Sequence, residues 1–390
     1  MRIRLSARRR LALLVLLSLL LAAVVGLDAG FDAYAVPTGS MEPLLHGDRS
    51  TGDRVLVRRI GGLGPTLRRF DVTVFRSPDG VHCVKRLGGR PNERVQILEG
   101  DLYVESALLR KDRGEREAVL VTVFDSDRDP GAGFWEPAGG AWRAEGGARI
   151  FDATDAAGSP ALLRYGAPVR DDYLDPDGRR VAGRLAVSDL VLEADFTPLS
   201  DLGELRIELA GKGDRFLFAL ERRADRSLAR VTRNGPKGEE VLVRGETAAV
   251  PAGVPVRLEA VNVDQRLEFR LDGKDVLPPH DYDRPIAGPP LGSPGSLGDG
   301  GEATAGGAAL GGLGLRARVG RIRLRRDLHY EARGRFAVER PLDLGPDQHF
   351  FLGDNSAESL DCREWGPVEG RALLGRPVFI YWPPRRMRWL

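Results

Sequence analysis

Apolar and polar residues alternate along several stretches in the middle of the chain. Leu190, Leu192, Ala194 and Phe196 fall on one side of an extended backbone, while Glu193 lies between them on the other. This period of two predicts a β-strand with one buried face. The same pattern recurs at residues 205–209, 216–218 and 267–271.

Short turn signals separate these stretches. Asn234-Gly235 and Asp272-Gly273 are dipeptides that favour the tight turns of β-hairpins. One-sided strands joined by such turns are typical of an antiparallel β-sandwich. We therefore expect a mainly β protein, with a sandwich within residues 105–340.

The N-terminus follows a different pattern. Residues 1–10 carry five arginines and no acid, and residues 11–27 form an apolar run without a charge. This pattern predicts a transmembrane anchor over 11–27, with residues 1–10 in the cytoplasm and the rest outside. A cleaved signal peptide is the alternative, because Ala33-Tyr34-Ala35 has the form of a cleavage site.

Composition excludes several classes of protein. The chain has 390 residues and a formal net charge of +2, which argues against nucleic-acid binding driven by bulk charge. Two cysteines exclude a disulfide-rich scaffold and a four-cysteine zinc site.

Three short segments carry candidate chemistry. Ser40 lies in a turn rich in Pro and Gly over residues 37–44. Lys85 lies on a strand expected after the turn at 77–80. A polar segment over 353–366, near the C-terminus, is flanked by apolar residues. Each segment alone is equally consistent with a surface turn or an edge strand.

Together these segments resemble the bacterial type I signal peptidase family, membrane-anchored serine proteases that remove signal peptides. Four boxes match in order, and they are S-M-x-P at 40–43, G-D-x-V-L-V at 52–57, V-K-R at 84–86 and G-D-N-x-x-x-S-x-D-x-R-x-W-G at 353–366. The resemblance covers residues 11–104 and 341–383. It implies a catalytic domain made of residues 31–104 and 341–390, interrupted by the insert 105–340.

The resemblance implies a role for each matching residue. Ser40 is expected to be the nucleophile and Lys85 the general base. Lysine takes a proton only when neutral, so the site must lower its pKa from about 10.4 by burial. The hydroxyl of Thr38 and the Ser40 N–H are expected to form the oxyanion hole. Ser359 is expected to orient the lysine.

The remaining expected site residues are structural or bind substrate. Asp361 and Arg363 match a structural ion pair that braces the site. Residues 34–37 are expected to form a strand that pairs with the substrate backbone. Shallow pockets for the small side chains of an Ala-x-Ala site are expected to be lined by Tyr34, Val36, Leu45, Val74 and Val84. Met41 and Leu44 are candidates for contact with the membrane surface.

The two cysteines fall within two of the boxes. Cys83 precedes the lysine by two residues, and Cys362 lies between Asp361 and Arg363. They are either two independent buried residues or a disulfide that ties the boxes together, which an extracytoplasmic compartment would permit.

The insert carries a second resemblance. Residues 256–276, with a strand ending in L-D-G-K, resemble the laminin-G and concanavalin-like jelly roll. Residues 285–316, rich in Gly, Pro and Ala, are expected to be a flexible loop. Asp171, Asp172, Asp175 and Asp177 do not have the spacing of a full calcium loop, so a solvated turn is expected there.

The sequence therefore predicts a serine endopeptidase that cleaves signal peptides from exported preproteins, without a metal or cofactor. We expect a single-pass protein of the cell inner membrane with its catalytic domain on the periplasmic side. Its expected partners are signal peptides, the lipid bilayer and a glycan or protein ligand of the insert, and no nucleic acid. The alternatives are a glycan- or protein-binding membrane protein with an inactive peptidase module, and a self-cleaving repressor-type protease.

Overall fold

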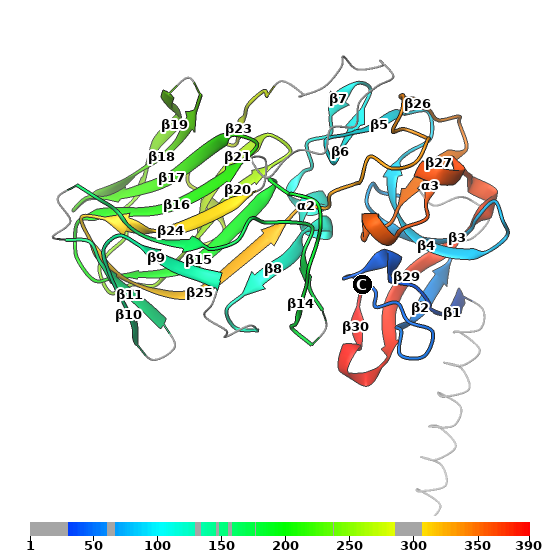
Figure 1. Ribbon diagram of the computed structural model, residues 1–390, viewed down its shortest axis with the longest axis horizontal. Coiled ribbons are helices and arrows are strands. Elements are labelled where there is room, and N and C mark those ends of the chain that lie inside the picture. The colour runs from blue at the N-terminus through cyan, green and yellow to red at the C-terminus, as the bar shows by residue number, and fades with distance from the viewer. Residues whose placement is uncertain are drawn as a thin grey trace, which may run out of the picture. The chain divides into compact units, whose positions relative to one another are not determined.

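The computed structural model describes residues 30–60, 67–128, 134–145, 148–154, 158–175, 177–236, 238–284 and 306–390. The chain divides into two compact units, one reaching to Glu93 and resuming at Asp343–Leu390, the other made of Arg94–Leu342 (Figure 1). We call the first the peptidase unit, after the family that its sequence resembles, and the second the insert unit. The predicted anchor at 11–27 and the N-terminus 1–10 lie outside the described residues.

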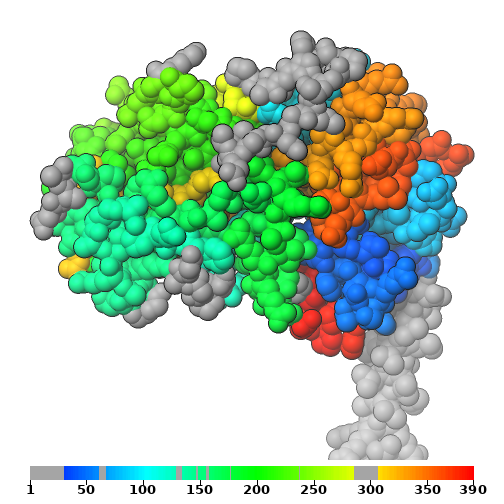
Figure 2. Space-filling model, in the orientation of Figure 1, coloured from blue at the N-terminus to red at the C-terminus, as the bar shows by residue number. Residues whose placement is uncertain are grey.

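The peptidase unit is built on one antiparallel sheet. Its strands follow the order β1 (Phe31–Ala35), β2 (Arg54–Arg59), β29 (Leu373–Trp382), β3 (Val72–Arg76), β4 (His82–Gly89), β27 (Gln348–Leu352) and β28 (Val368–Glu369), and β30 (Arg388–Trp389) also pairs with β29. Strands β2 and β29, from the two parts of this unit's sequence, are therefore neighbours, and the blue and red surfaces lie side by side in Figure 2. Short helices complete the unit, namely η1 (Gly39–Met41), η4 (Ser356–Glu358), α3 (Cys362–Trp365), η5 (Gly370–Ala372) and η6 (Pro384–Arg386).

The insert unit contains two large antiparallel sheets. The first has the order β10 (Ala141–Glu145), β11 (Ala148–Asp152), β25 (Arg316–Arg326), β15 (Leu190–Pro198), β20 (Val256–Val263), β21 (Arg266–Leu271) and β22 (Lys274–Asp275), with β8 (Val121–Asp125) on β25 and β23 (His280–Asp281) on β21. The second has the order β19 (Gly238–Ala248), β18 (Arg226–Gly235), β17 (Asp214–Arg222), β16 (Gly203–Gly211), β24 (Gly307–Leu313), β12 (Ala161–Tyr165) and β9 (Trp135–Ala138).

Smaller elements complete the insert unit. They are the pair β13 (Tyr173–Leu174) and β14 (Arg180–Val181), the strands β5 (Arg94–Leu98), β6 (Asp101–Val104) and β7 (Ala107–Leu108), and helix α2 (Arg113–Val119). The second boundary in sequence between the two units falls within strand β26 (Leu342–Asp343). A capping box between Asp112 and Glu115 begins α2. Among the described residues, no helix has both the length and the apolar character needed to cross a membrane.

The two large sheets share one hydrophobic core, as a β-sandwich requires. Phe196 of β15 and Leu258 of β20 belong to the same buried cluster as Ile207 of β16 and Phe218 of β17. The predicted inward face of 190–196 is confirmed, because all four of its apolar residues are buried in this cluster. The hairpin at Asp272-Gly273 is also confirmed, with positive φ at both turn residues.

The structure differs from two sequence-based boundaries. β5 and β6 cluster with the insert unit, so the division falls after Glu93 rather than after residue 104. Residues 307–313, expected within a flexible loop, form the interior strand β24, between β16 and β12. A Cβ at Gly311 would lie 1.9 Å from the carbonyl oxygen of Ala161, so the glycine there permits the close approach of β12. Residues 285–305 of that predicted loop lie outside the described residues.

Candidate active site

The turn that carries Ser40 follows the edge strand β1. Thr38 is extended and precedes the single 3₁₀ turn η1, which places Ser40 and Met41 in buried positions. A Cβ at Gly47 would lie 1.6 Å from the Thr38 carbonyl oxygen, so this residue must be glycine for the loop to close on the turn. The Pro/Gly-rich sequence thus holds a buried serine in an irregular backbone.

Lys85 reaches Ser40 from the β3–β4 hairpin. Thr73 pairs with Lys85 and Phe75 pairs with Cys83 in the antiparallel register, so these four side chains share one face. Lys85 Nζ donates a hydrogen bond to Ser40 Oγ, and both residues are buried. The structure therefore brings together the two residues of the predicted dyad, which are 45 positions apart in sequence.

Burial lowers the pKa of Lys85 from its ordinary value. The charges of Asp361, Cys83 and Asp354 raise this pKa, and that of Arg363 lowers it, but desolvation is the largest effect. Desolvation disfavours the ammonium form, which leaves a larger share of the neutral amine near neutral pH. The neutral amine is the form that can accept a proton from a serine hydroxyl.

Asp361 is the centre of the hydrogen-bond network beside the lysine. Its carboxylate accepts bonds from Gly353 N (3.0 Å), Ser359 Oγ (2.7 Å) and the Arg363 guanidinium (2.9 Å from Nε and from Nη2). Asp361 and Arg363 are almost fully buried, so their charges compensate each other away from water. The predicted ion pair is therefore present. Ser359 donates its hydroxyl hydrogen bond to Asp361. The expected role of Ser359 in orienting Lys85 stays a prediction.

The same network reaches the nucleophile. Asn355 N donates to the Ser40 carbonyl oxygen at 3.1 Å, which ties η4 to η1. A Cβ at Gly353 would lie 2.1 Å from Ser359 Oγ and 2.6 Å from the Ser40 carbonyl oxygen. Arg86, next to the lysine, forms a two-pronged pair with Asp354 at 2.7 and 2.6 Å. The last box thus supports the dyad through buried polar contacts.

The five predicted substrate-binding residues gather in one apolar cluster. Val36, Leu45 and Val74 are buried members, and Tyr34 and Val84 pack against them from partly exposed positions. Val36, Leu45 and Val74 are thus almost fully covered, whereas Tyr34 and Val84 keep exposed surface, and substrate binding by these five residues stays a prediction. Met41 is fully buried in the same cluster, which corrects its expected contact with the membrane surface.

The two cysteines are free thiols. Cys362 Sγ instead accepts hydrogen bonds from Phe351 N (3.1 Å) and Trp365 Nε1 (3.4 Å), and burial raises its pKa to about 12. Cys83 is partly exposed. The structure thus agrees with two independent residues rather than a disulfide.

Two buried carboxylates in the peptidase unit were missed in the sequence. Glu42, two residues after Ser40, lies with its Oε1 2.7 Å from His46 Nδ1 and accepts a bond from Gly47 N at 3.1 Å. Asp53, of the second box, pairs with Arg386 at 2.6 and 2.8 Å. This pair holds the basic C-terminal segment, residues 383–390, against the residue that precedes β2, although Trp389 remains 75% exposed. The one feature of the sequence that could have indicated these two carboxylates is their position inside one of the four boxes, Glu42 in the first and Asp53 in the second.

An acidic cluster lies in the insert unit. Carboxylate oxygens of Asp101, Asp189, Asp264 and Asp327 approach within 4.8 Å of one another. The Lys111 ammonium already lies 2.7 Å from Asp264 and 2.7 Å from Asp327. Burial is the main cause that raises the pKa of Asp101 to about 8 and of Asp327 to about 7. Lysine therefore supplies positive charge where a cation would bind.

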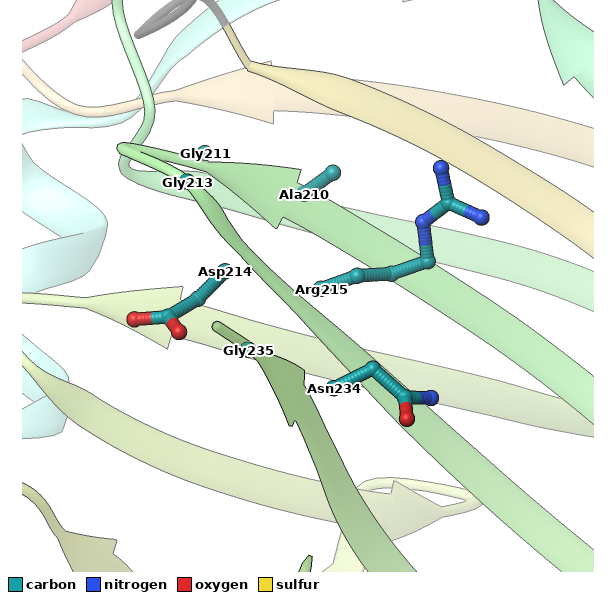
Figure 3. A pocket seen from close by; sticks show the side chains of 7 residues that line it. All are labelled: Ala210, Gly211, Gly213, Asp214, Arg215, Asn234 and Gly235. Atoms are coloured by element: carbon teal, nitrogen blue, oxygen red, sulfur yellow. The ribbon is translucent and has the colours of Figure 1, made fainter. Parts of the chain in front are cut away.

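The insert unit also has a surface hollow of about 470 Å³, lined by Ala210, Gly211, Gly213, Asp214, Arg215, Asn234 and Gly235 (Figure 3). Asp214 is engaged by Arg233 at 3.0 and 2.6 Å. The lining contains no aromatic ring. None of the predicted site residues lies in it.

Comparison with known proteins matches the peptidase boxes. Residues 8–122 and 324–382 match the family described as signal peptidase, peptidase S26. Signal peptidase I T of Bacillus subtilis is 31% identical over 99 residues, which cover 24% of this chain and 49% of that protein. Signal peptidase I of Bacillus licheniformis is 33% identical over 99 residues, covering 24% and 51%. The chain spans about half the length of these two curated relatives.

A plant relative matches over a shorter stretch. The probable thylakoidal processing peptidase 2 of Arabidopsis thaliana is 47% identical over 38 residues, which is 10% of each chain.

Among solved structures, similar folds come from β-sandwich proteins. The carbohydrate-binding module CBM66 from Bacillus subtilis has a TM-score of 0.31 at 12% identity, covering 48% of this chain and 92% of that one. Galectin LEC-6 from Caenorhabditis elegans has a TM-score of 0.26 at 11% identity, covering 45% and 94%. At these TM-scores the likeness says nothing about a ligand.

The four ordered boxes and the two matched segments agree on the same residues. The resemblance of this chain is therefore to the signal peptidases of family S26, with a β-sandwich inserted between the two parts of the peptidase sequence.

Proposed function

We propose that this protein is a membrane-bound serine endopeptidase that removes signal peptides from exported preproteins with a Ser40–Lys85 dyad. The hydrogen bond between Lys85 Nζ and Ser40 Oγ, in a site where burial lowers the pKa of the lysine, carries the proposal. The family match supports a peptidase, and the apolar run at 11–27 supports a membrane anchor. On this proposal the catalytic domain faces the periplasm.

The proposed reaction uses the dyad twice. Neutral Lys85 accepts the proton of Ser40 Oγ as the oxygen attacks the carbonyl carbon of the small −1 residue. The Ser40 N–H and the exposed Thr38 hydroxyl donate to the oxyanion that develops. The Lys85 ammonium then gives its proton to the leaving amine, and water releases the acyl group with Lys85 again as the base.

The test is cleavage of a preprotein with an Ala-x-Ala site by the full-length protein in detergent. Wild type should cut after the −1 Ala, and Ser40→Ala and Lys85→Ala should lower kcat by at least about a thousandfold, because each removes a reacting group. Glu364→Gln, a change at a more exposed residue of the last box, is the matched control and should cut like wild type. Activity retained in either dyad variant would rule out this mechanism.

A further inference from the structure

The carboxylate of Glu42 is held in the loop that follows the nucleophile. Glu42 is 7% exposed, and its Oε1 is 2.7 Å from His46 Nδ1 and accepts a hydrogen bond from Gly47 N at 3.1 Å. Its Oε2 is buried without a hydrogen-bond partner in the part of the chain that the structure describes. A buried carboxylate oxygen without a partner costs free energy, so hydrophobic packing does not explain the residue.

The residue that Glu42 holds packs directly on the peptide before the nucleophile. A Cβ at Gly47 would lie 1.6 Å from the Thr38 carbonyl oxygen and 2.6 Å from Gly39 N. The next residue of the loop, Asp48, donates its N–H to the Val36 carbonyl oxygen at 3.1 Å. The position of Gly47 therefore limits where the Thr38–Gly39 peptide can lie.

The other side of the turn is held as well. Glu42 N donates to the Gly39 carbonyl oxygen at 3.0 Å, and Asn355 N donates to the Ser40 carbonyl oxygen at 3.1 Å. The backbone from Thr38 to Ser40 thus lies between the Asn355 side and the Gly47 side. On the Gly47 side the loop is held by the Asp48–Val36 bond and by a bond of 2.8 Å from His46 N to Asp53 Oδ2, and the bond to Gly47 itself is made by the Glu42 carboxylate oxygen.

We propose that Glu42 is a positioning residue that holds Gly47 against the Thr38–Gly39 peptide and so fixes the two oxyanion donors, the Thr38 hydroxyl and the Ser40 N–H. This inference rests on the proposed function. Glu42 touches neither the scissile bond nor Lys85 in this role. Its contribution is to the placement of donors that act on charge developing in the transition state.

A misplaced oxyanion hole has a specific kinetic signature. Interactions made only in the transition state change kcat and leave KM unaltered, whereas a distorted substrate groove raises KM. Glu42→Ala should lower kcat about tenfold and change KM less than about twofold, which is smaller than the loss from removing a donor outright. Glu42→Gln should stay within about threefold of wild type, because an amide oxygen still accepts from Gly47 N.

The experiment measures kcat and KM of full-length variants on the Ala-x-Ala preprotein. The matched control is Glu358→Gln, an exposed carboxylate on another side of Gly39, with Oε2 3.2 Å from a Cβ built there. Glu358→Gln should have the kcat and KM of wild type if Glu42 acts by holding Gly47 in place. It should lower kcat if a negative charge near Ser40 is what matters. A loss in Glu42→Ala that falls on KM, or no loss, overturns the proposal. Equal losses in Glu42→Ala and Glu42→Gln also overturn it.

Two further measurements keep the test decisive. If Glu42→Ala does not fold, Glu42→Met replaces it, because methionine keeps much of the side-chain volume and removes the acceptor for Gly47 N, and an unchanged kcat there overturns the proposal. All variants are also acylated at Ser40 with a p-nitrophenyl ester, a reaction that passes through the same oxyanion. Wild type that reacts with the ester but leaves the preprotein uncut refutes the proposed substrate, and the ester rates then decide the role of Glu42.

Discussion

The pKa of Lys85 results from two opposing effects, burial and the charges of neighbouring side chains. Burial lowers its pKa, while the carboxylates of Asp361 and Asp354 raise it. These carboxylates form ion pairs with Arg363 and Arg86, and the positive charges of the two arginines weaken the effect of the carboxylates on the pKa of Lys85. The site thus keeps the polar contacts that position Lys85 without restoring its ordinary basicity.

This balance predicts a dependence of stability on pH. Because the folded pKa is depressed, the folded protein binds fewer protons than the unfolded chain between that lowered pKa and the ordinary value. The free energy of unfolding should therefore contain a cost from Lys85 that is present at neutral pH and disappears as pH rises through this window. Lys85→Met should be more stable than wild type at pH 7, by about 1.4 kcal/mol for each unit of depression.

Urea unfolding of Lys85→Met and wild type at several pH values measures this directly. The advantage of the methionine variant should narrow as pH rises toward the ordinary lysine pKa. Thr51→Ala, at an exposed loop position, serves as a control with no charge change. A difference between Lys85→Met and wild type that is constant across pH would contradict a depressed pKa at this residue.

Single residues also show what sequence reasoning reaches. Ser40 and Lys85 were predictable because each stands in a box of fixed spacing, and the structure joins them. Glu42 stands in the box of Ser40 and Asp53 in the second box, but their partners His46 and Arg386 lie outside the boxes. These contacts depend on the path that the loops take, and the pattern of neighbouring residues in the sequence does not determine that path.

Among the elements, strand β1 contains Tyr34 and Ala35 of the stretch 34–37, which the family resemblance predicts to pair with an extended substrate. It pairs with β2, and among the described residues no strand pairs with its other edge. In an antiparallel pair, every second residue of an edge strand directs its N–H and C=O groups to the partner strand, and the residues between direct theirs outward. Because β1 leads directly into the turn of Ser40, a substrate strand added at this edge would reach the nucleophile.

Replacing single substrate amides tests this pairing. A series of peptides around the Ala-x-Ala site, each with one N-methylated amide on the N-terminal side of the cut, should show an alternating pattern. Removing an amide hydrogen that bonds to β1 should lower kcat/KM about tenfold, and the neighbouring positions should change little. The unmodified peptide is the reference, and a uniform response along the series would argue against pairing with β1.

The elements also mark where composition misleads. Residues 307–313 are mostly Gly and Ala, which predicted a loop, yet they form the interior strand β24. The glycines there permit close approach of the neighbouring backbone at Ala161. The alternating stretch 190–196 was correct because its period reports a buried face. A strand built for close packing rather than for side-chain burial has no such period.

At the scale of the whole molecule, the peptidase unit is made of two separate parts of the sequence, whose ends at the insertion point lie next to each other. Leu344 N donates to the Glu93 carbonyl oxygen at 2.9 Å, and Asn92 N donates to the Gly345 carbonyl oxygen at 3.2 Å. The two ends from which the insert unit departs are therefore paired with each other. The resemblance to the peptidase family located the insert, whereas this pairing could not be read from sequence.

This closure predicts that the peptidase unit folds without the insert. Replacing residues 94–342 by Asn-Gly would join the paired ends with a tight turn and leave the dyad contacts intact. The shortened protein, kept with its N-terminal segment, should unfold cooperatively and cut the Ala-x-Ala preprotein within about tenfold of wild type, because loop closure changes the free energy of unfolding only slowly with length. Its Ser40→Ala form is the control for cleavage by a contaminant. A folded but inactive shortened protein would place a required part of the reaction in the sandwich, whereas a chain that does not fold would make the sandwich a structural support of the peptidase unit.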